Sequence, residues 1–517
     1  MYQPDLLLDM KSAGILMHIS SLPTEFGIGD LGQTAYRFAD LLHEHGQKYW
    51  QILPLNWCGY SNSPYNPISA FATFPYLISP ELLFEDGLVS SSELDAARLP
   101  NSAEVDYISV YQAKDALFTT AVECWLQRTG IEDYIESNSS DLKPFLAYVT
   151  LCEIYGNDDW YHWLGEHRTY SAALYDRLWH KYSRRMSYYA VLQAIFEDQF
   201  HRLHQYLRSL DIKLIGDLPL YCSYQSADVW ANQQLFDLDD EGKRRTVAGV
   251  PPDAFSETGQ LWGNPTFRWD VMQNDGFDWW LRRIGNALKY NDLLRLDHFI
   301  GYVNYWSIDA SEETAVNGRW IPAPAEIFFA ALFSRYDRSR FIAEDLGILN
   351  AEVCRIRDKY ALPGMIILQF CFDNPAVDPD QYPEDRIIYT GTHDNDTIMG
   401  WYRHLIESGA AEANIIHEYL QRSHRIDTLP TDPLTDVNWH LIDIAYASPC
   451  HLAIVPFQDI LGLGTEARIN TPGIPLGNWH WRLIDETYLN TSHYKWNEML
   501  KLNLRYNNLS ITLTNLF

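Results

Sequence analysis

The chain has 517 residues, of which 47% are hydrophobic and 21% charged, a size and composition typical of a globular protein with a large core. Its 68 acidic residues against 39 basic ones give a formal charge of −29, which repels phosphate backbones and anionic membranes. The charge therefore argues against nucleic-acid and membrane partners and favours a neutral substrate.

The seven cysteines are widely spaced, odd in number and form no CxxC pair. This usage predicts neither a disulfide framework nor a zinc site. Reduced thiols indicate a cytoplasmic protein. The first residues lack the features of a secretory signal, and the sequence has no run of about 18 apolar residues, so we expect no membrane segment.

Eight short apolar runs follow one another along the chain, and each ends in polar or charged residues. Continuous apolar runs are typical of parallel strands that are buried on both faces. The runs cover residues 14–20, 49–55, 213–221, 293–299, 341–346, 364–370, 387–394 and 453–460.

Apolar residues at helical spacing lie between several of these runs, as in residues 35–42 and 192–207. Eight strands that alternate with helices predict an α/β fold, the (β/α)8 TIM barrel. A doubly wound open sheet is the alternative, but no glycine-rich phosphate loop follows the first run.

The unequal spacing of the runs predicts two insertions into one catalytic barrel domain that covers residues 1–517. Residues 56–212 exceed one crossover, and we expect them to form a mainly helical subdomain after the second strand. Residues 222–292 contain a loop rich in proline and glycine, and we expect a loop subdomain after the third strand. Insertions after barrel strands build the site at the carboxyl-terminal face.

Three carboxylates, Asp297, Glu344 and Asp394, stand at or just past the ends of predicted strands. In a barrel these ends converge, and converging acids suit glycoside chemistry, in which one attacks the anomeric carbon and another protonates the leaving oxygen. Each could instead be a structural strand-end acid or a helix N-cap. A metal site would use the same residue types together with His298 and His393, but adjacent His–Asp pairs point to opposite sides of a strand.

The sequence resembles the 4-α-glucanotransferases, or amylomaltases, of glycoside hydrolase family 77 in the α-amylase clan. The resemblance extends over residues 14–481 and rests on long motifs whose order and spacing match. The motifs are SAGILMHISSLP, GIGDLG, SPYNPISAFA, IGDLPLYCSYQSADVW, GVPPDAFSETGQLWGNP, LLRLDHFIGYVNYW, AEDLG, PGMIILQF, YTGTHDNDT and INTPGIPLGNWHWRL.

The resemblance implies a role for each of the three carboxylates. Asp297 is expected to be the nucleophile, Glu344 the general acid/base and Asp394 the stabiliser of the transition state. Arg295 lies two residues before Asp297, on the same face of the strand, and resembles the partner that keeps the nucleophile ionised. Asp217 resembles the acid that orients this arginine and the nucleophile. A structural salt bridge of the barrel is the alternative for Arg295, and a structural strand-end acid is the alternative for Asp217.

Other residues are implied as contacts to the glucan. His298 and His393 resemble donors to hydroxyls of the sugar at the cleavage point, although they could be packing histidines. The remaining expected contacts are Asp253, Gln260 and Trp262 in one loop, Ser63 and Tyr65 on the donor side, and Asn470. Core packing is the alternative for Trp262, and turn formation is the alternative for Asp253 and Asn470.

The resemblance thus implies a retaining 4-α-glucanotransferase acting on α-1,4-glucans, with no metal or organic cofactor and no C-terminal β-domain. A hydrolase of the same clan and a non-catalytic glucan-binding barrel are the alternatives. The chain departs from the family pattern at Ile300 and Ile366, where arginine and lysine are usual. The sequence does not indicate an oligomeric state.

Overall fold

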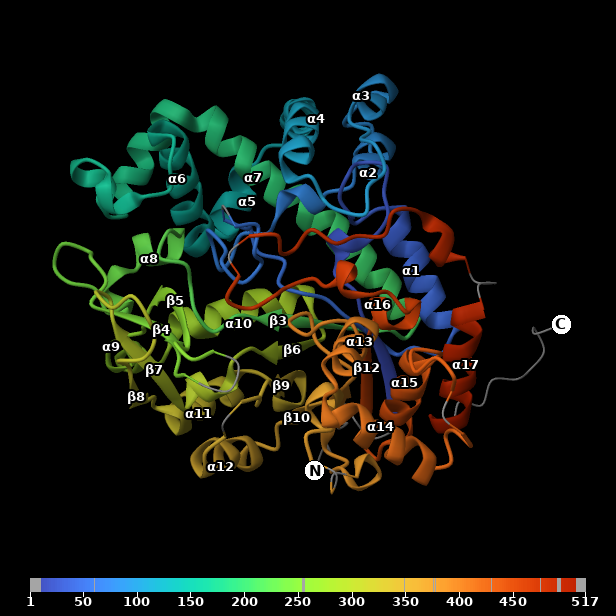
Figure 1. Cartoon of the computed structure of the whole chain (residues 1–517). Coiled ribbons are helices and arrows are strands. Elements are labelled where there is room, and N and C mark those ends of the chain that lie inside the picture. Colours follow the sequence, from blue (N-terminus) through green and yellow to red (C-terminus); the bar gives the residue numbers. More distant parts are fainter. Residues whose placement is uncertain are drawn as a thin grey trace, which may run out of the picture.

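The centre of the protein is a barrel of parallel strands, seen in a computed structural model that describes residues 11–59, 61–252, 256–347, 349–374, 376, 378–428, 430–474, 476–490 and 494–507. Eight strands pair in the order β10-β11-β12-β1-β2-β3-β6-β9. Figure 1 shows β3, β6 and β9 among them at the centre of the fold. The backbone N–H of Ala343 donates to the carbonyl of Pro363 at 2.9 Å, so β9 meets the segment before β10 and the ring nearly closes. The strands are β1 Ser12–Leu16, β2 Tyr49–Gln51, β3 Lys213–Leu218, β6 Leu293–Leu296, β9 Phe341–Ala343, β10 Gly364–Ile367, β11 Arg386–Tyr389 and β12 Leu452–Pro456.

These strands confirm the predicted (β/α)8 barrel, but each ends before its apolar run does. The run continues because the chain beyond the strand stays buried while it turns, as in the 3-10 turns Ile19–Ser21 and Phe299–Tyr302. Buried turns need apolar side chains as strands do, so hydrophobicity alone does not mark the strand end. The polar residues of interest therefore lie largely in loops at the carboxyl ends of the strands.

Helices surround the barrel and occupy its crossovers. The predicted helical patterns at 35–42 and 192–207 fall within α1 and α7. The helices are α1 Gln33–Glu44, α2 Pro80–Glu85, α3 Ser91–Ala96, α4 Tyr107–Arg128, α5 Glu132–Ser137, α6 Ser139–Tyr155, α7 Ala172–Ser209, α8 Ala227–Ala231, α9 Trp269–Asn274, α10 Asp278–Tyr290, α11 Ala325–Arg335, α12 Ala351–Lys359, α13 Ile398–Ser408, α14 Ala411–Arg422, α15 Val437–Ala447, α16 Phe457–Leu461 and α17 Tyr494–Tyr506.

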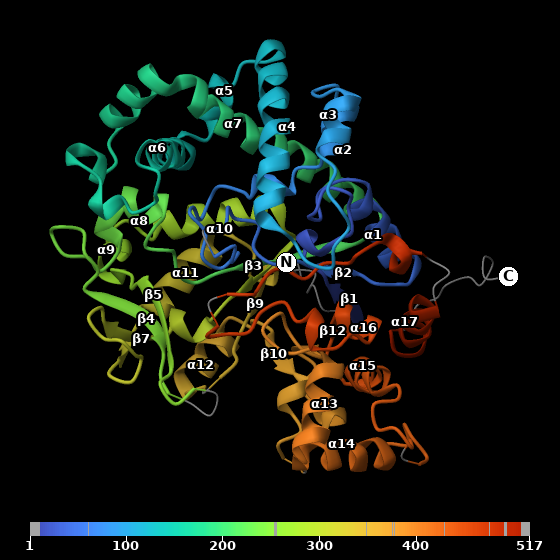
Figure 2. The same cartoon turned by 45° about the horizontal axis from the view of Figure 1, so that its top comes forward.

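The segment between β2 and β3 contains α2 to α7. In Figures 1 and 2 these helices rise on one side of the barrel, and α13, α14 and α15 lie on the opposite side. Several begin with a side-chain cap, such as Asp106 before α4, whose carboxylate accepts from the backbone N–H of Ser109. The treatment of 56–212 as one subdomain stays a prediction.

A second sheet, which the sequence analysis did not predict, stands beside the barrel. Its four antiparallel strands pair in the order β5-β4-β7-β8. Two come from the turn-rich segment 222–292, and two follow β6, so the sheet combines two crossovers. Its strands are short, and all of them except β7 contain Gly or Pro, which concealed their periodicity. They are β4 Thr246–Val250, β5 Gln260–Pro265, β7 Asn304–Asp309 and β8 Arg319–Pro322.

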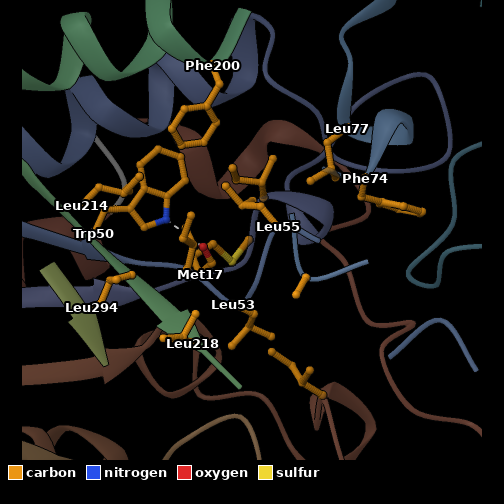
Figure 3. Close-up of a cluster of buried hydrophobic side chains, with 14 of the residues drawn as sticks. Met17, Trp50, Leu53, Leu55, Phe74, Leu77, Phe200, Leu214, Leu218 and Leu294 are labelled. Carbon is orange, nitrogen blue, oxygen red and sulfur yellow. Dashed lines mark hydrogen bonds between the residues drawn. The ribbon is translucent and has the colours of Figure 1, made fainter. Parts of the chain in front are cut away.

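The core has two parts because the barrel strands are buried on both faces. Tyr49 of β2 belongs to a cluster with residues of all the other barrel strands, which fills the barrel interior. Its neighbour Trp50 points the other way, and its indole Nε1 donates to the carbonyl of Met17 at 2.7 Å. Figure 3 shows Trp50 among Leu214 of β3, Phe200 of α7 and Met17, which directly follows β1. This packing fixes the strands whose ends carry the candidate site.

Candidate active site

The candidate catalytic residues converge at the carboxyl-terminal end of the barrel. Asp217 and Arg295 belong to the neighbouring strands β3 and β6, and Asp297 directly follows β6. Glu344 is the first residue after β9, and Asp394 lies in the loop after β11. Residues far apart in sequence thus meet at one face of the barrel, where barrel enzymes build their active sites.

Arg295 holds two of the acids together. Its Nη1 donates to Asp217 Oδ2 at 2.6 Å and to Asp297 Oδ1 at 2.9 Å. The Arg295 and Asp217 side chains are buried, whereas that of Asp297 is 25% exposed. The adjacent carboxylates raise the pKa of Arg295 well above its usual value, despite burial, so the guanidinium stays charged. A fixed positive charge therefore lies beside the oxygen of Asp297.

Asp217 receives a second donor from the loop after β2. The hydroxyl of Tyr65 donates to Asp217 Oδ2 at 2.8 Å. Burial and the Asp217 charge raise the pKa of Tyr65 well above its usual value, so the phenol keeps its proton. In the same loop Ser63 Oγ accepts from the backbone N–H of Tyr65 at 3.2 Å, and the Ser63 side chain thereby shapes the turn.

Glu344 is bound by backbone donors. Its Oε2 accepts from the N–H of His298 at 2.6 Å, and its Oε1 accepts from the N–H of Leu346 at 3.3 Å. His298 adopts a left-handed conformation, with φ of 50°, and this turn directs its N–H at the carboxylate. Burial raises the pKa of Glu344 to about 8, although the Arg295 charge opposes the shift. Glu344 is therefore largely protonated at neutral pH, as a general acid must be.

Asp394 is held by a different set of residues. Asn470 Nδ2 donates to Asp394 Oδ1 at 2.6 Å, and His393 Nε2 lies 3.4 Å from the same oxygen. Arg468 Nη2 donates to the backbone carbonyl of Asp394 at 2.6 Å. The Asp394 side chain is 43% exposed. It is accessible from solvent, as a group that faces substrate must be.

Tyr65 joins the two groups of acids. Its ring stacks on that of His393, with centroids 4.9 Å apart and an interplanar angle of 15°. The ring of Trp479 lies 5.6 Å from Tyr65 and 5.9 Å from His393. The hydroxyl that contacts Asp217 and the ring that stacks on His393, the residue before Asp394, therefore belong to one side chain.

The residues of this site lie in or next to the motifs that resemble the 4-α-glucanotransferases. The comparison with known proteins decides whether the chain belongs to that family. A family described as 4-alpha-glucanotransferase matches residues 17–487 of the chain. The chain belongs to the 4-alpha-glucanotransferase family. It is 41% identical over 481 residues to a 4-alpha-glucanotransferase of Aquifex aeolicus, covering 92% of this chain and 96% of that protein. It is 39% identical over 486 residues to one of Thermus thermophilus, covering 92% and 95%.

A solved structure extends the family assignment to the fold. The chain is similar to an amylomaltase from Streptococcus agalactiae in complex with acarbose, with a TM-score of 0.89 and 32% identity. The match covers 96% of this chain and 99% of that one. The resemblance inferred from the motifs is confirmed.

In this member of the 4-alpha-glucanotransferase family, Trp262 of β5 lies beside His298, the residue that follows Asp297. Its ring meets that of His298 edge to face at 4.9 Å, and its side chain is 38% exposed. Its Nε1 donates to Gln260 Oε1 at 3.2 Å. Trp262 is thus an accessible aromatic at the site rather than a core residue. Asp253, expected in the same loop, lies outside the described residues.

Two residues at the site were not singled out by the sequence analysis. Arg468 donates through Nε to the carbonyl of Asn470 at 2.7 Å and so supports both Asn470 and Asp394. Trp479 completes the aromatic group around His393. Arg468 directly precedes the motif INTPGIPLGNWHWRL and Trp479 lies within it, and this proximity was the available signal.

The two residues that depart from the family pattern, Ile300 and Ile366, lie in apolar surroundings. Ile300 is buried in the turn after His298, and Ile366 of β10 is half-buried and packs against the core. Among the residues that the structure describes, no helix has the length and apolar character needed to cross a bilayer.

Proposed function

We propose that this chain is a 4-α-glucanotransferase that moves a segment of an α-1,4-glucan to the 4-hydroxyl of glucose or of another glucan. The observation that carries the proposal is the pairing of Asp297, bound to the Arg295 guanidinium, with Glu344, whose pKa is raised to about 8. One acid is thereby prepared to attack and the other to donate a proton.

In the first step Asp297 attacks the anomeric carbon of the donor. Arg295 engages Oδ1, so we expect Oδ2 to form the new bond. The bond from the anomeric carbon to the O4 of the leaving sugar breaks, and Glu344 gives its proton to that oxygen. The product is a glycosyl ester on Asp297, an ionised Glu344 and a free glucan with a new 4-hydroxyl.

In the second step the acceptor takes the place of the leaving sugar. Glu344, now a carboxylate, removes the proton from the acceptor 4-hydroxyl, and that oxygen attacks the anomeric carbon. The ester bond breaks and Asp297 is released as a carboxylate. Two inversions retain the α configuration.

Asp394 and the two histidines act on the transferred sugar. The carboxylate of Asp394 stabilises the positive charge that develops at the ring in the transition state. Burial lowers the pKa of His298 to about 4, so the ring is neutral at pH 7. Its buried Nε2 has no hydrogen-bond partner among the described residues, and a sugar hydroxyl is the partner that we propose.

Maltotriose tests the proposal against hydrolysis, the alternative that uses the same carboxylates. Transfer yields glucose and a ladder of longer maltodextrins, with little gain in total reducing ends. Products are separated by chromatography while reducing ends are counted in the same sample. Reducing ends that rise in step with cleavage would establish a hydrolase. Unchanged maltotriose would indicate a non-catalytic glucan-binding barrel.

Trp262→Ala should lower transfer more than bond cleavage. A sugar ring stacks on an exposed indole, and we place the acceptor there because Trp262 contacts His298 next to the nucleophile. Loss of this stacking should weaken acceptor binding by about 1–3 kcal/mol, the range for truncating an aromatic interface residue. The measurement is the ratio of transfer to hydrolysis on maltotriose at equal conversion.

Trp320→Ala is the matched control for this prediction. Trp320 of β8 is 42% exposed in the same sheet but on the far edge strand from β5. It should leave the ratio unchanged. If Trp262→Ala lowers both rates together at a constant ratio, Trp262 acts on the donor side or in the fold.

The proposed partners are maltooligosaccharides and longer α-1,4-glucans. We also propose a cytoplasmic location, because all seven cysteines are free thiols, as expected in a reducing compartment.

A further inference from the structure

One buried side chain anchors both ends of the loop that carries His393 and Asp394. The carboxylate of Asp459 accepts from the hydroxyl of Thr390 through Oδ2 at 2.7 Å. Its Oδ1 accepts from the backbone N–H of Ile398 at 2.8 Å. Thr390 directly follows β11, and Ile398 is the first residue of α13. The loop between them is therefore held at its entry and its exit by one carboxylate.

Asp459 is itself fixed by regular structure. It lies in α16, which directly follows β12, and only 1% of its surface is exposed. Its backbone carbonyl accepts from Asn438 Nδ2 of α15 at 2.8 Å. Strand β12 pairs with β11, so the anchor and the loop start from adjacent strands of the barrel. The hydrogen bonds to this carboxylate thus fix the loop relative to the barrel.

A small pocket that is partly open to solvent borders the loop and is lined by Asp459, His393, Asp396, Arg468 and residues around them. On that side the loop has fewer packing contacts, so its hydrogen bonds help to define the position of the backbone.

Other hydrogen bonds shape the middle of the loop. Asn395 Oδ1 accepts from the backbone N–H and the hydroxyl of Thr392, both at 2.9 Å. Gln369 Nε2 donates to the carbonyl of Asp396 at 2.8 Å. These contacts set the curvature of the loop, and the bonds to Asp459 set where the curve begins and ends.

We propose that Asp459 is a positioning residue, which acts through Thr390 and Ile398 to place Asp394 for transition-state stabilisation. The inference rests on the proposed function. Asp459 contacts no reacting atom, and its effect on the reaction passes through the loop.

The test is a mutant cycle with Asp394. Asp459→Ala removes both acceptors and should lower kcat on maltotriose roughly 10- to 100-fold, the loss expected from a misplaced catalytic group, with KM changed less than about 3-fold. In an Asp394→Asn background the same change should cost less than about 3-fold, because the group that it positions is already disabled. A purely structural defect would lower activity equally in both backgrounds.

Two further variants sharpen the test. Asp459→Asn keeps an oxygen for the Ile398 N–H and offers an amide N–H to the Thr390 hydroxyl, so it should restore most of the kcat that alanine loses. Thr390→Val removes the hydroxyl that donates to Asp459, with little change of volume. It replaces Asp459→Ala in the mutant cycle if Asp459→Ala does not fold. It should lower kcat less than Asp459→Ala does and show the same loss of effect in the Asp394→Asn background.

Asp292→Ala is the matched control. Asp292 precedes β6 at the opposite end of the barrel, where its Oδ2 accepts from the backbone N–H of Leu214 at 2.9 Å and contacts His204 at 2.9 Å. It should lower the thermal midpoint and leave kcat per folded molecule unchanged.

Additive effects of the Asp459 and Asp394 substitutions, or an unchanged kcat in Asp459→Ala, would overturn the inference. If the wild type fails to disproportionate maltotriose, the proposed function fails instead, and the cycle is measured on fluoride release from α-glucosyl fluoride.

Discussion

Asp297→Asn should lower turnover of maltotriose on the order of 10⁴-fold, the scale on which enzymes lose activity when a covalent nucleophile is removed. The amide keeps the shape of the side chain but cannot attack the anomeric carbon as an anion. The fold should survive, because Arg295 retains its 2.6 Å hydrogen bond to Asp217. Initial rates and the thermal midpoint are measured on the same preparation.

Asp309→Asn is the control for this substitution. Asp309 is an exposed residue of β7 whose Oδ1 accepts from the N–H of Ser311 at 2.9 Å. It should keep wild-type turnover. Turnover near the wild-type value in Asp297→Asn, with an unchanged midpoint, would remove Asp297 from the nucleophilic role.

Glu344→Gln should lower turnover of maltotriose roughly 10²- to 10⁴-fold, the range for general acid–base catalysis, and should spare the first step on α-glucosyl fluoride. Fluoride leaves without a proton, whereas the oxygen of a sugar needs one. The measurement is the burst of fluoride release in the first turnover.

Asp394→Asn provides the contrast, because its charge supports the transition state whatever group leaves. It should slow the fluoride burst and the turnover of maltotriose alike. Equal slowing of the burst by both substitutions would contradict the separate roles of Glu344 and Asp394.

Much of the fold could be predicted because parallel barrel strands have a strong signal. Strand β12 is apolar at every position, since one face of the strand fills the barrel and the other packs against helices. The sheet of β4, β5, β7 and β8 has no comparable signal. Its strands are short, and β4 and β5 are joined through a turn-rich loop, so long-range pairing rather than local sequence defines them.

The site was predictable where local geometry was sufficient. The spacing of Arg295 and Asp297 placed both on one face of the chain, and the 2.9 Å contact agrees. The contact from the His298 N–H to Glu344 could not be foreseen, because it depends on a left-handed backbone at a residue other than glycine. The roles themselves came from the family resemblance and stay predictions.

The contacts that hold Asp394 in place could not be foreseen from the sequence either. Asn470 and Arg468 approach it from a loop more than 70 residues away in the sequence, and only the fold brings these segments together. Asp459 reaches the loop from α16 in the same way. A buried carboxylate with two donors leaves no pattern in the sequence that separates it from an ordinary acid.

The central claim is that Asp297 carries the transferred glucan as a covalent ester, and mass spectrometry tests it most directly. Glu344→Gln is mixed with α-glucosyl fluoride, quenched in acid and digested. The missing general base slows release of the sugar, so the intermediate should accumulate. We predict that one glucosyl unit is found on the peptide that contains Asp297. A fluoride burst with no adduct, or an adduct on the peptide that contains Asp394, would contradict the mechanism.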